Sequence, residues 1–357
     1  MEPIDKGFSV VICAYNAEKR IVPTLEALAT VTIPPGYTIE LILVDNASKD
    51  NTSAASQMLW NQLGSPFPLR LLTENRPGKG FAVETGYDAA ALSYILTVDD
   101  DNWLSPDYLT RAAALLEKDP EIGILQGHSI GVFEQEPPAW IHHENMEHYF
   151  VIGGPIGEPG YYPPNNYGVW GAGMILKKAD WDYLRSKGFS FLTSKIPGKA
   201  AGEDHELAIG LLMLGRKVYY NPEMTFRHYM PADRVVWKKL QQNFDTYGYC
   251  SHYNFLYSLA LEATEAKRQV TNRDIFRAFQ AFFRRSVKTF TPKQLLAYWL
   301  KPQKQLYQLR IRQYFAHYRW YFRLRKKALN DVQHLQSWMI PVLEEHPGNF
   351  KWPWKTY

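Results

Sequence analysis

The chain has 357 residues, of which 46% are hydrophobic, 15% aromatic and 21% charged, with a formal net charge of +4; this composition excludes a disordered or fibrous protein. Its two cysteines, Cys13 and Cys250, lie far apart, which excludes a disulfide framework and favours a reducing cytoplasm. No apolar run approaches the ~20 residues that span a bilayer, and residues 1–7 resemble no signal peptide. We therefore expect a cytoplasmic protein, soluble or held at the inner face of the membrane.

The first part of the chain alternates short β-rich apolar runs with helical patterns, which is typical of βαβ units and an α/β fold with a largely parallel sheet. The predicted strands are 8–13, 39–44, 69–72, 94–98 and 122–125, and the predicted helices are 18–29, 52–63, 80–92 and 106–118. Open sheets of this kind bind ligands beyond the carboxyl ends of their strands. Polar residues follow four of these ends, at 15–16, 45–46, 74–75 and 99–102.

Beyond residue 126 the pattern changes. We expect a helix at 140–150, a loop rich in Gly and Pro at 153–166 that faces a ligand, helices beginning near 178 and 203, and a strand at 217–220. From residue 233 onward the pattern is helical and increasingly basic. We place a domain boundary near Pro231.

The strand ending at 98 runs into three consecutive carboxylates, Asp99, Asp100 and Asp101. If the extended backbone continues, Asp99 and Asp101 share one side and Asp100 points away. Two converging carboxylates suit a hard cation such as Mg²⁺ or Mn²⁺. The alternative is a solvated acidic turn, because Asp and Asn also favour turns.

The acidic cluster is the fourth of several motifs that follow successive strands. The others are Val10-Val11-Ile12-Cys13-Ala14-Tyr15-Asn16-Ala17-Glu18, Leu43-Val44-Asp45-Asn46-Ala47-Ser48, Glu74-Asn75-Arg76-Pro77-Gly78-Lys79-Gly80, Gly171-Ala172-Gly173-Met174 and Gly202-Glu203-Asp204-His205. This ordered set, over residues 8–250, resembles the family 2 glycosyltransferases. The resemblance implies the type A glycosyltransferase fold, a Rossmann-like and mostly parallel sheet flanked by helices. It divides residues 1–231 into a nucleotide-binding half (1–126) and an acceptor-binding half (127–231), with a helical, basic extension at 232–357.

The resemblance also assigns residues to a nucleotide-sugar donor, with a UDP-sugar favoured over a GDP-sugar. The expected nucleotide and donor contacts are Ala14, Tyr15, Asn16, Glu18, Asp45, Asn75, Lys79, Asp99, Asp100 and Arg234. The expected metal ligands are Asp101, Asp99 and His228, and the expected sugar pocket is formed by Trp170, Gly171, Ala172 and Gly173. The alternative for His228 is a histidine that packs or forms hydrogen bonds without binding a metal. The alternative for Arg234 is a residue on a helix surface that faces solvent. Asn102 departs from the third carboxylate that is frequent in the family, and Lys79 lacks the following Ser or Thr of a phosphate-binding P-loop.

Sugar transfer with inversion needs a base for the acceptor hydroxyl. The resemblance implies that Asp204, next to Glu203, is this base. The alternative is that the pair only stabilises a helix start, where carboxylates interact well with the helix dipole.

A separate feature is the charge of residues 275–330, which contain fourteen Lys and Arg and no Asp or Glu. The rest of the chain then holds 26 basic and 36 acidic residues. A basic helix with many aromatic residues can lie on an anionic membrane, or it can pack on the acidic body or in a homo-oligomer. Nucleic acid is not expected as a partner, because no recognition module accompanies the charge.

Taken together, these features predict a metal-dependent, inverting glycosyltransferase that acts on a saccharide or lipid-linked acceptor, as in polysaccharide or glycoconjugate synthesis. A nucleotidyltransferase that makes a nucleotide-sugar needs a similar sheet and metal site. A third reading is a non-catalytic module that binds a glycan or a nucleotide-sugar.

Overall fold

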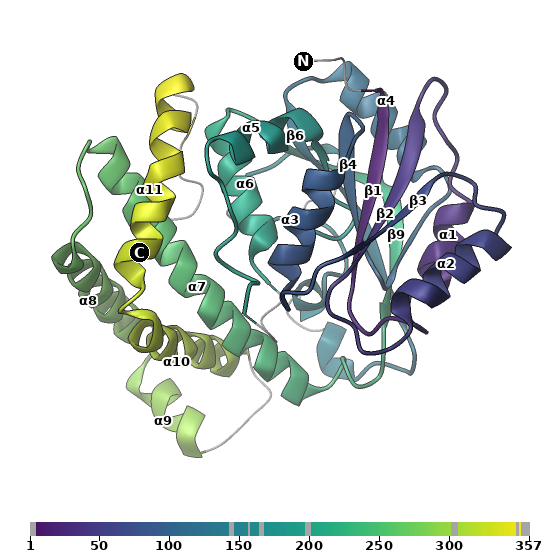
Figure 1. Cartoon of the computed structure of the whole chain (residues 1–357). Helices are drawn as coiled ribbons and strands as arrows, with labels where there is room; N and C mark the ends of the chain where they lie inside the picture. Colours follow the sequence, from purple (N-terminus) through teal and green to yellow (C-terminus); the bar gives the residue numbers. More distant parts are fainter. Residues whose placement is uncertain are drawn as a thin grey trace.

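The computed structural model describes residues 5–142, 146–155, 158–163, 168–196, 201–300, 306–347 and 350. These residues form one mixed sheet covered by helices, with a helical region on one side (Figure 1). The strands are β1 (Gly7–Ala14), β2 (Thr38–Asp45), β3 (Leu69–Thr73), β4 (Tyr94–Asp99), β5 (Asn102–Leu104), β6 (Ile122–Phe133), β7 (Gly160–Tyr161), β8 (Ile175–Lys177) and β9 (Lys217–Met230). The helices of the first part are α1 (Val22–Ala29), α2 (Thr52–Gln62), α3 (Lys79–Ala89), α4 (Tyr108–Lys118), α5 (Lys178–Ser186) and α6 (Glu203–Met213).

The sheet has the strand order β3-β2-β1-β4-β8-β6-β9-β5, and β7 pairs with β9. It is parallel from β3 to β4, and β8 then runs antiparallel between β4 and β6. The α/β fold and the parallel strands of the first part confirm the prediction.

Alternation along the strands explains the two-sided core. On β1, Val10 and Ile12 pack on the face that α1 and α4 cover, whereas Val11 packs on the face that α3 covers. Because successive side chains point to opposite faces, strands buried on both sides appear in the sequence as continuous apolar runs.

Two local predictions were wrong. The helix expected at 140–150 is a pair of short 3₁₀ helices, Ala139–His142 and Met146–Phe150, with residues 143–145 outside the described part. Over so few turns the apolar spacing does not distinguish a 3₁₀ helix from an α-helix. Helix α1 begins at Val22 instead of Glu18, because the backbone N–H of Glu18 donates to Asp50 and its carboxylate accepts from Asn51.

The loop predicted at 153–166 lies partly outside the described residues, at 156–157 and 164–166. In its described part, Gly153 pairs with Ser129, and Gly160–Tyr161 pairs with β9. The chain here follows the edge of the sheet.

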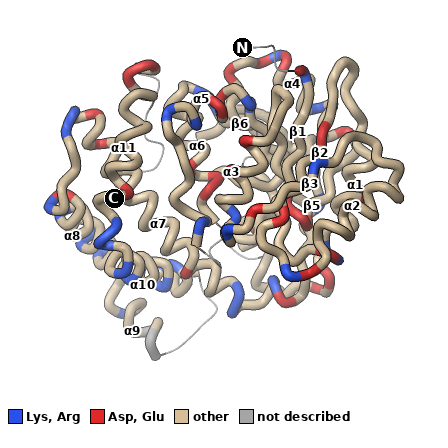
Figure 2. The backbone as a smooth tube through the Cα atoms, viewed as in Figure 1, with Lys and Arg blue, Asp and Glu red and all other residues tan. Residues whose placement is uncertain are grey.

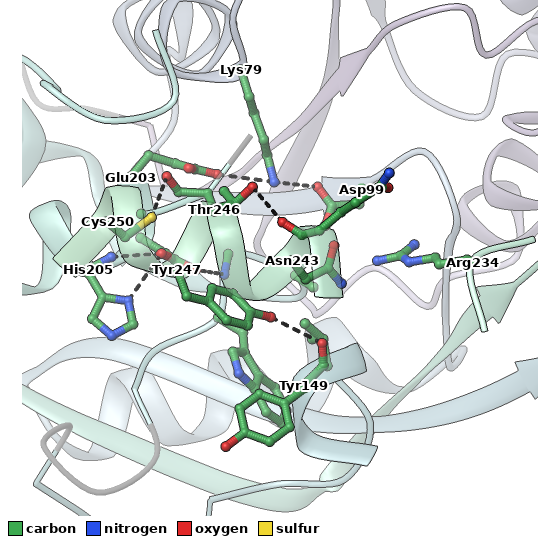
Figure 3. A pocket seen from close by; sticks show the side chains of 18 of the residues that line it. Lys79, Asp99, Tyr149, Glu203, His205, Arg234, Asn243, Thr246, Tyr247 and Cys250 are labelled. Atoms are coloured by element: carbon green, nitrogen blue, oxygen red, sulfur yellow. Dashed lines mark hydrogen bonds and ion pairs between the residues drawn. The ribbon is translucent and has the colours of Figure 1, made fainter. Parts of the chain in front are cut away.

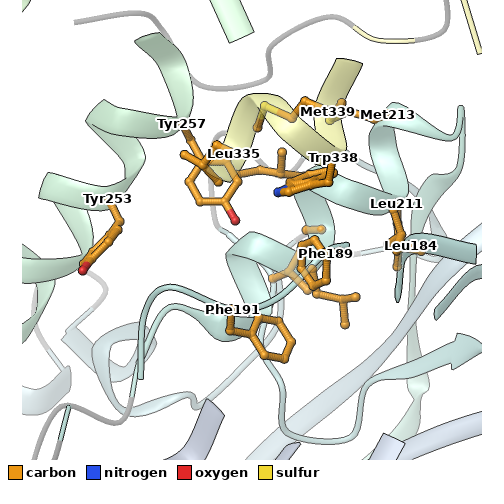
Figure 4. Close-up of a cluster of buried hydrophobic side chains, with 14 of the residues drawn as sticks. Leu184, Phe189, Phe191, Leu211, Met213, Tyr253, Tyr257, Leu335, Trp338 and Met339 are labelled. Carbon is orange, nitrogen blue, oxygen red and sulfur yellow. The ribbon is translucent and has the colours of Figure 1, made fainter. Parts of the chain in front are cut away.

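The helical region comprises α7 (Trp237–Glu265), α8 (Asn272–Thr289), α9 (Pro292–Leu300), α10 (Leu306–Leu324) and α11 (Ala328–Glu345). One hydrophobic core continues from α3, α5 and α6 into α7, α8 and α11. Figure 4 shows the part of this core to which α5, α6, α7 and α11 contribute. Trp338 of α11, which is fully buried, lies 5.1 Å from Phe189, measured between ring centroids. Within the described residues no helix is long and apolar enough to cross a membrane.

Replacing Trp338 with alanine is expected to lower the free energy of unfolding by about 3–5 kcal/mol, because a large buried side chain leaves a cavity. Urea unfolding monitored by circular dichroism measures this loss. Phe276→Ala, on a side chain that is 53% exposed, is the control and is expected to change stability by less than about 0.5 kcal/mol. A Trp338→Ala variant as stable as the parent would show that α11 does not stabilise the part of the molecule that contains the sheet.

Acid should weaken the packing of α7 on α10. His252 is fully buried and neither ring nitrogen has a hydrogen-bond partner among the described residues. Burial, together with the charge of Lys327, lowers the pKa of His252 to about 4. Between about pH 6.5 and pH 4, His252 is therefore protonated in the unfolded chain but not in the folded chain. The contribution of His252 to the free energy of unfolding is full above about pH 6.5 and falls as the pH drops toward 4. We expect a loss of up to about 2 kcal/mol at pH 5 from this group. Urea titrations at pH 7.5 and 5 would show the loss, and His252→Phe should reduce it.

Candidate active site

A cleft of about 1100 Å³ lies between the sheet and α7 (Figure 3). It brings together residues that are more than a hundred positions apart in the sequence. Of the predicted site residues, those that line it are Lys79, Asp99, Asp100, Asp101, Trp170, Gly171, Ala172, Glu203, Asp204, His228 and Arg234.

The three consecutive carboxylates occupy a turn. Strand β4 ends at Asp99, and Asp100 and Asp101 form the turn into β5, so the alternation expected for an extended strand does not apply. Each carboxylate instead faces a different cation. Asp99 contacts Lys79 at 3.0 Å, Asp100 contacts Arg20 at 2.6 Å, and Asp101 contacts Arg234 at 2.8 Å.

Asn102 holds this turn closed. It is fully buried, its side-chain oxygen accepts from the backbone N–H of Asp99, and its amide donates to Asp101. A carboxylate at this position would offer no donor to Asp101 and would repel it. The amide that departs from the family pattern therefore has a structural function.

His228 is placed beside Asp101 by the antiparallel pairing of β5 with β9, in which Asn102 lies opposite His228. The imidazole is 2% exposed, its Nδ1 lies 3.2 Å from the carbonyl oxygen of Val151, and its Nε2 lies 3.5 Å from an Asp101 oxygen. Nε2 has no hydrogen-bond partner within the described chain. Nδ1 donates to the carbonyl oxygen of Val151, so in the neutral imidazole Nε2 carries the lone pair, and a cation between this nitrogen and the carboxylate would satisfy both.

No cluster of three or more His, Cys, Asp or Glu that could hold a metal ion occurs in the described ranges. Two protein ligands are nevertheless enough for Mg²⁺, which commonly takes one or two carboxylates together with phosphate oxygens. The carboxylate of Asp101 is one such ligand, and a neutral imidazole at His228 would add a nitrogen ligand beside it.

Lys79 lies between two carboxylates, 3.0 Å from Asp99 and 3.2 Å from Glu203 (Figure 3). Burial by itself lowers the pKa of Lys79, but Asp99 and Glu203 outweigh it and hold the pKa well above its ordinary value. The ammonium of Lys79 therefore stays charged inside the cleft. The second oxygen of Glu203 is buried and unpaired within the described structure.

Asp204 stands in the first turn of α6 and faces the cleft. Its carboxylate accepts from the N–H of Gly171 at 3.2 Å and from the N–H of His205 at 2.8 Å. Burial raises the pKa of Asp204, but hydrogen bonding to His205 and the charges of His205 and Lys79 outweigh this, so the pKa lies below its ordinary value. Asp204 is thus ionised at neutral pH, and it stabilises the helix start as well as facing the cleft.

The other predicted residues lie outside the lining of the cleft. Tyr15 and Asn75 are exposed on neighbouring loops, and Ala14 is buried at the end of β1. Asn16 and Glu18 bind the loop that follows β2, and Asp45 accepts from Ser48 and Ser53. Gly173, with φ +68°, packs against Tyr108 and Phe226, where a larger residue would clash, so it shapes the core and not the cleft.

Some residues that line the cleft were not predicted from the sequence. Arg20 comes from the loop before α1, eighty positions from its partner Asp100. One wall is a face of α7 with Gln313 of α10, and its polar and aromatic members are Gln242, Asn243, Thr246, Tyr247, Ser251 and Asn254. Their spacing of three and four residues along one helix is a signal that sequence reasoning could have used.

Comparison with known proteins agrees with this geometry. The model of the family described as "Glycosyl transferase family 2" matches residues 9–184. The chain therefore contains a domain of this family. A family 2 relative is the poly(ribitol-phosphate) β-N-acetylglucosaminyltransferase TarS of Staphylococcus aureus, 30% identical over 111 residues that cover 31% of this chain and 19% of TarS. A second is the human dolichyl-phosphate β-glucosyltransferase, 37% identical over 103 residues, or 27% of this chain and 31% of that protein.

The chain thus spans less than a third of the length of these two family 2 relatives. Over a longer range, the structure of S. aureus TarS residues 1–349 in complex with UDP-GlcNAc has a TM-score of 0.52 and 16% identity, and covers 95% of this chain and 90% of that one. The expected type A glycosyltransferase fold, with its helical C-terminal region, is confirmed.

Proposed function

We propose that the protein transfers a sugar from a nucleotide-sugar, a UDP-sugar in preference to a GDP-sugar, to a hydroxyl group of a saccharide or lipid-linked acceptor. The observation that carries the proposal is that the Asp99–Asp101 turn and Asp204 line one cleft. The turn offers a place for a metal-bound diphosphate, and Asp204 offers a base. The UDP-GlcNAc complex of TarS supports the choice of a UDP-sugar.

The donor diphosphate would lie along the acid cluster, where Lys79 and Arg234 both reach into the cleft. Their charges are balanced by Asp99 and Asp101 in this structure, so an incoming diphosphate can exchange for these contacts. Asp45 and Asn16, on the loops next to the cleft, would hold the nucleoside.

A divalent cation, Mg²⁺ or Mn²⁺, would be held by Asp101 and His228, with Asp99 nearby. When bound, such a cation neutralises charge that develops on the departing diphosphate. The residues themselves orient the donor: the buried His228 is fixed by Val151, and Asp101 is fixed by Asn102 and Arg234.

Asp204 would accept the proton of the acceptor hydroxyl, with Glu203 holding Lys79 beside it. The acceptor oxygen forms a bond to the anomeric carbon while the bond from that carbon to the diphosphate oxygen breaks, and the electron pair leaves with the diphosphate. Attack from the side opposite the leaving group inverts the anomeric configuration. Because the pKa of Asp204 lies below its ordinary value, its side chain is an ionised carboxylate at neutral pH, which is the form that can accept a proton.

The acceptor would lie along α7. Amide and hydroxyl side chains there, such as Asn243, Thr246 and Asn254, can pair with sugar hydroxyls, and Tyr149, Tyr247 and Trp170 offer aromatic surface. Trp170 and the N–H of Gly171 lie at the same end as Asp204. The part of this wall that α7 forms belongs to the helical region, beyond the segment that the family model matches.

Calorimetric titration with a panel of UDP-sugars and GDP-sugars, with and without Mn²⁺, tests the donor. We expect one group of nucleotide-sugars to bind with micromolar affinity, and to bind at least tenfold more weakly when the metal is removed by chelation. Equal binding with and without metal would exclude the proposed metal site. Binding of nucleoside triphosphates but no nucleotide-sugar would favour a nucleotidyltransferase.

A further inference from the structure

A second feature of the molecule lies away from the cleft, on the outer side of α8, α9 and α10. Half of the large hydrophobic side chains that are exposed on the described surface gather there. We call this surface the α8–α10 face, and it consists of Phe276, Phe283, Val287, Leu296, Phe315 and Phe322. Every exposed phenylalanine of the described chain belongs to it. Scattered exposed apolar residues are ordinary, but a cluster of this kind marks an interaction surface.

Helical spacing places these residues in stripes. On α8, residues 276, 283 and 287 recur at seven and four positions, which is one side of the helix, and on α10 residues 315 and 322 recur at seven. The buried side of α8 packs on α10, where the rings of Phe279 and Tyr321 stack with centroids 3.6 Å apart. Phe283 lies 5.4 Å from Tyr318, and Phe322 lies 5.7 Å from Phe279. Phe283 and Phe322 therefore border the seam where α8 meets α10.

The same helices are strongly basic (Figure 2). Residues 275–330 contain fourteen Lys and Arg and no Asp or Glu. The carboxylates that pair with cations of this segment, Asp245 and Asp331, come from α7 and α11. Exposed cations on these helices include Arg277, Arg284, Lys288, Lys293, Arg310 and Arg323.

We propose that the α8–α10 face binds the surface of an anionic lipid membrane, with the phenylalanines entering the interface and the Lys and Arg side chains contacting acidic headgroups. Two helices that lie side by side and expose both aromatic rings and cations suit this environment, in which apolar burial and electrostatic attraction add. Binding of a soluble polyanion would need only the basic residues, and it would not account for the exposed phenylalanines beside them. This proposal does not depend on the donor or the acceptor.

The placement of α10 gives the contact a consequence. Gln313 of α10 lines the cleft, while Phe315 and Phe322 of the same helix are exposed. One helix thus borders both the cleft and the proposed membrane surface. A protein bound in this way would hold its cleft near the lipid headgroups.

Sedimentation of the full chain with vesicles tests the proposal. Large vesicles of phosphatidylcholine with 30% phosphatidylglycerol are compared with vesicles of phosphatidylcholine alone, at low salt and at 0.5 M salt. We expect binding to the anionic vesicles at low salt, at least tenfold weaker binding to neutral vesicles, and release by salt. Failure of the parent chain to bind anionic vesicles would overturn the proposal.

Two variants locate the surface. Phe283→Ser with Phe322→Ser removes exposed rings, and Arg284→Glu with Lys288→Glu reverses charge; each pair is expected to weaken binding at least tenfold. Met58→Ser, on a side chain of α2 that is 59% exposed, and Lys118→Glu on α4 are the matched controls and should bind as the parent does. Unchanged thermal midpoints confirm that the variants fold. Vesicle binding by the α8–α10 variants equal to that of the parent would show that this surface is not a membrane site. The same conclusion would follow if the parent bound no vesicles and light scattering showed a dimer that the variants could not form.

Discussion

Replacing Asp204 with asparagine is expected to lower the rate of sugar transfer by about 10²- to 10⁴-fold, the usual contribution of a general base. Asparagine keeps the shape of the side chain and can still accept from the N–H of Gly171, but it cannot take the proton of the acceptor hydroxyl. Nucleotide-sugar affinity should remain within about threefold of the parent. Steady-state kinetics and calorimetry on the same preparation measure the two quantities.

A matched control is Asp107→Asn. Asp107 lies at a helix start, immediately before α4, and pairs with Arg111, but it lies outside the cleft lining. It should change stability slightly and transfer not at all. If Asp204→Asn transfers sugar at the parental rate, Asp204 only stabilises the start of α6, and the base must be sought elsewhere.

Replacing Asp101 with asparagine is the second large change. We expect transfer to fall by about 10³-fold, because the metal contribution amounts to several kcal/mol. The substitution also removes the negative charge of the Asp101 carboxylate, which lies 2.8 Å from the Arg234 guanidinium and 3.5 Å from Nε2 of His228. The metal concentration for half-maximal activity should rise at least tenfold.

Asp100→Asn is the informative comparison, because Asp100 is next in sequence but pairs with Arg20. The substitution is expected to leave the metal site undisturbed, so its half-maximal metal concentration should match that of the parent, whatever its effect on rate. The assignment to Asp101 would fail if both variants shifted the metal response equally.

The sequence predicted the elements that depend on local pattern. Continuous apolar runs such as 39–44 became buried parallel strands, and the polar residues that follow them gathered at one edge, as the geometry of an open sheet requires. Of these polar residues only Asp99, Asp100 and Asp101 line the cleft, where Lys79 and Asp204 join them from the starts of α3 and α6. The alternation argument failed at Asp99, because the strand ends there and a turn held by Asn102 redirects the next two carboxylates.

Long-range pairings could not be predicted. Nothing near Arg20 in the sequence indicates that it binds Asp100, and nothing near Trp338 indicates that it packs on Phe189. The sequence pattern predicted a helical, basic region after residue 232. It did not predict that this region shares a core with α6, where the carboxylate of Glu206 accepts a hydrogen bond from Tyr257 of α7. Such contacts depend on how the elements assemble, which composition and periodicity do not encode.

The measurement that tests the central claim most directly is phosphorus NMR of a reaction that contains the protein, Mn²⁺-free Mg²⁺ buffer, the nucleotide-sugar that binds best and a panel of saccharide acceptors. The proposed transfer predicts that the diphosphate resonances of the nucleotide-sugar are replaced by those of the free nucleoside diphosphate, and that this conversion requires Asp204. Release of pyrophosphate from a nucleoside triphosphate and a sugar phosphate, with the nucleotide-sugar left intact, would contradict it.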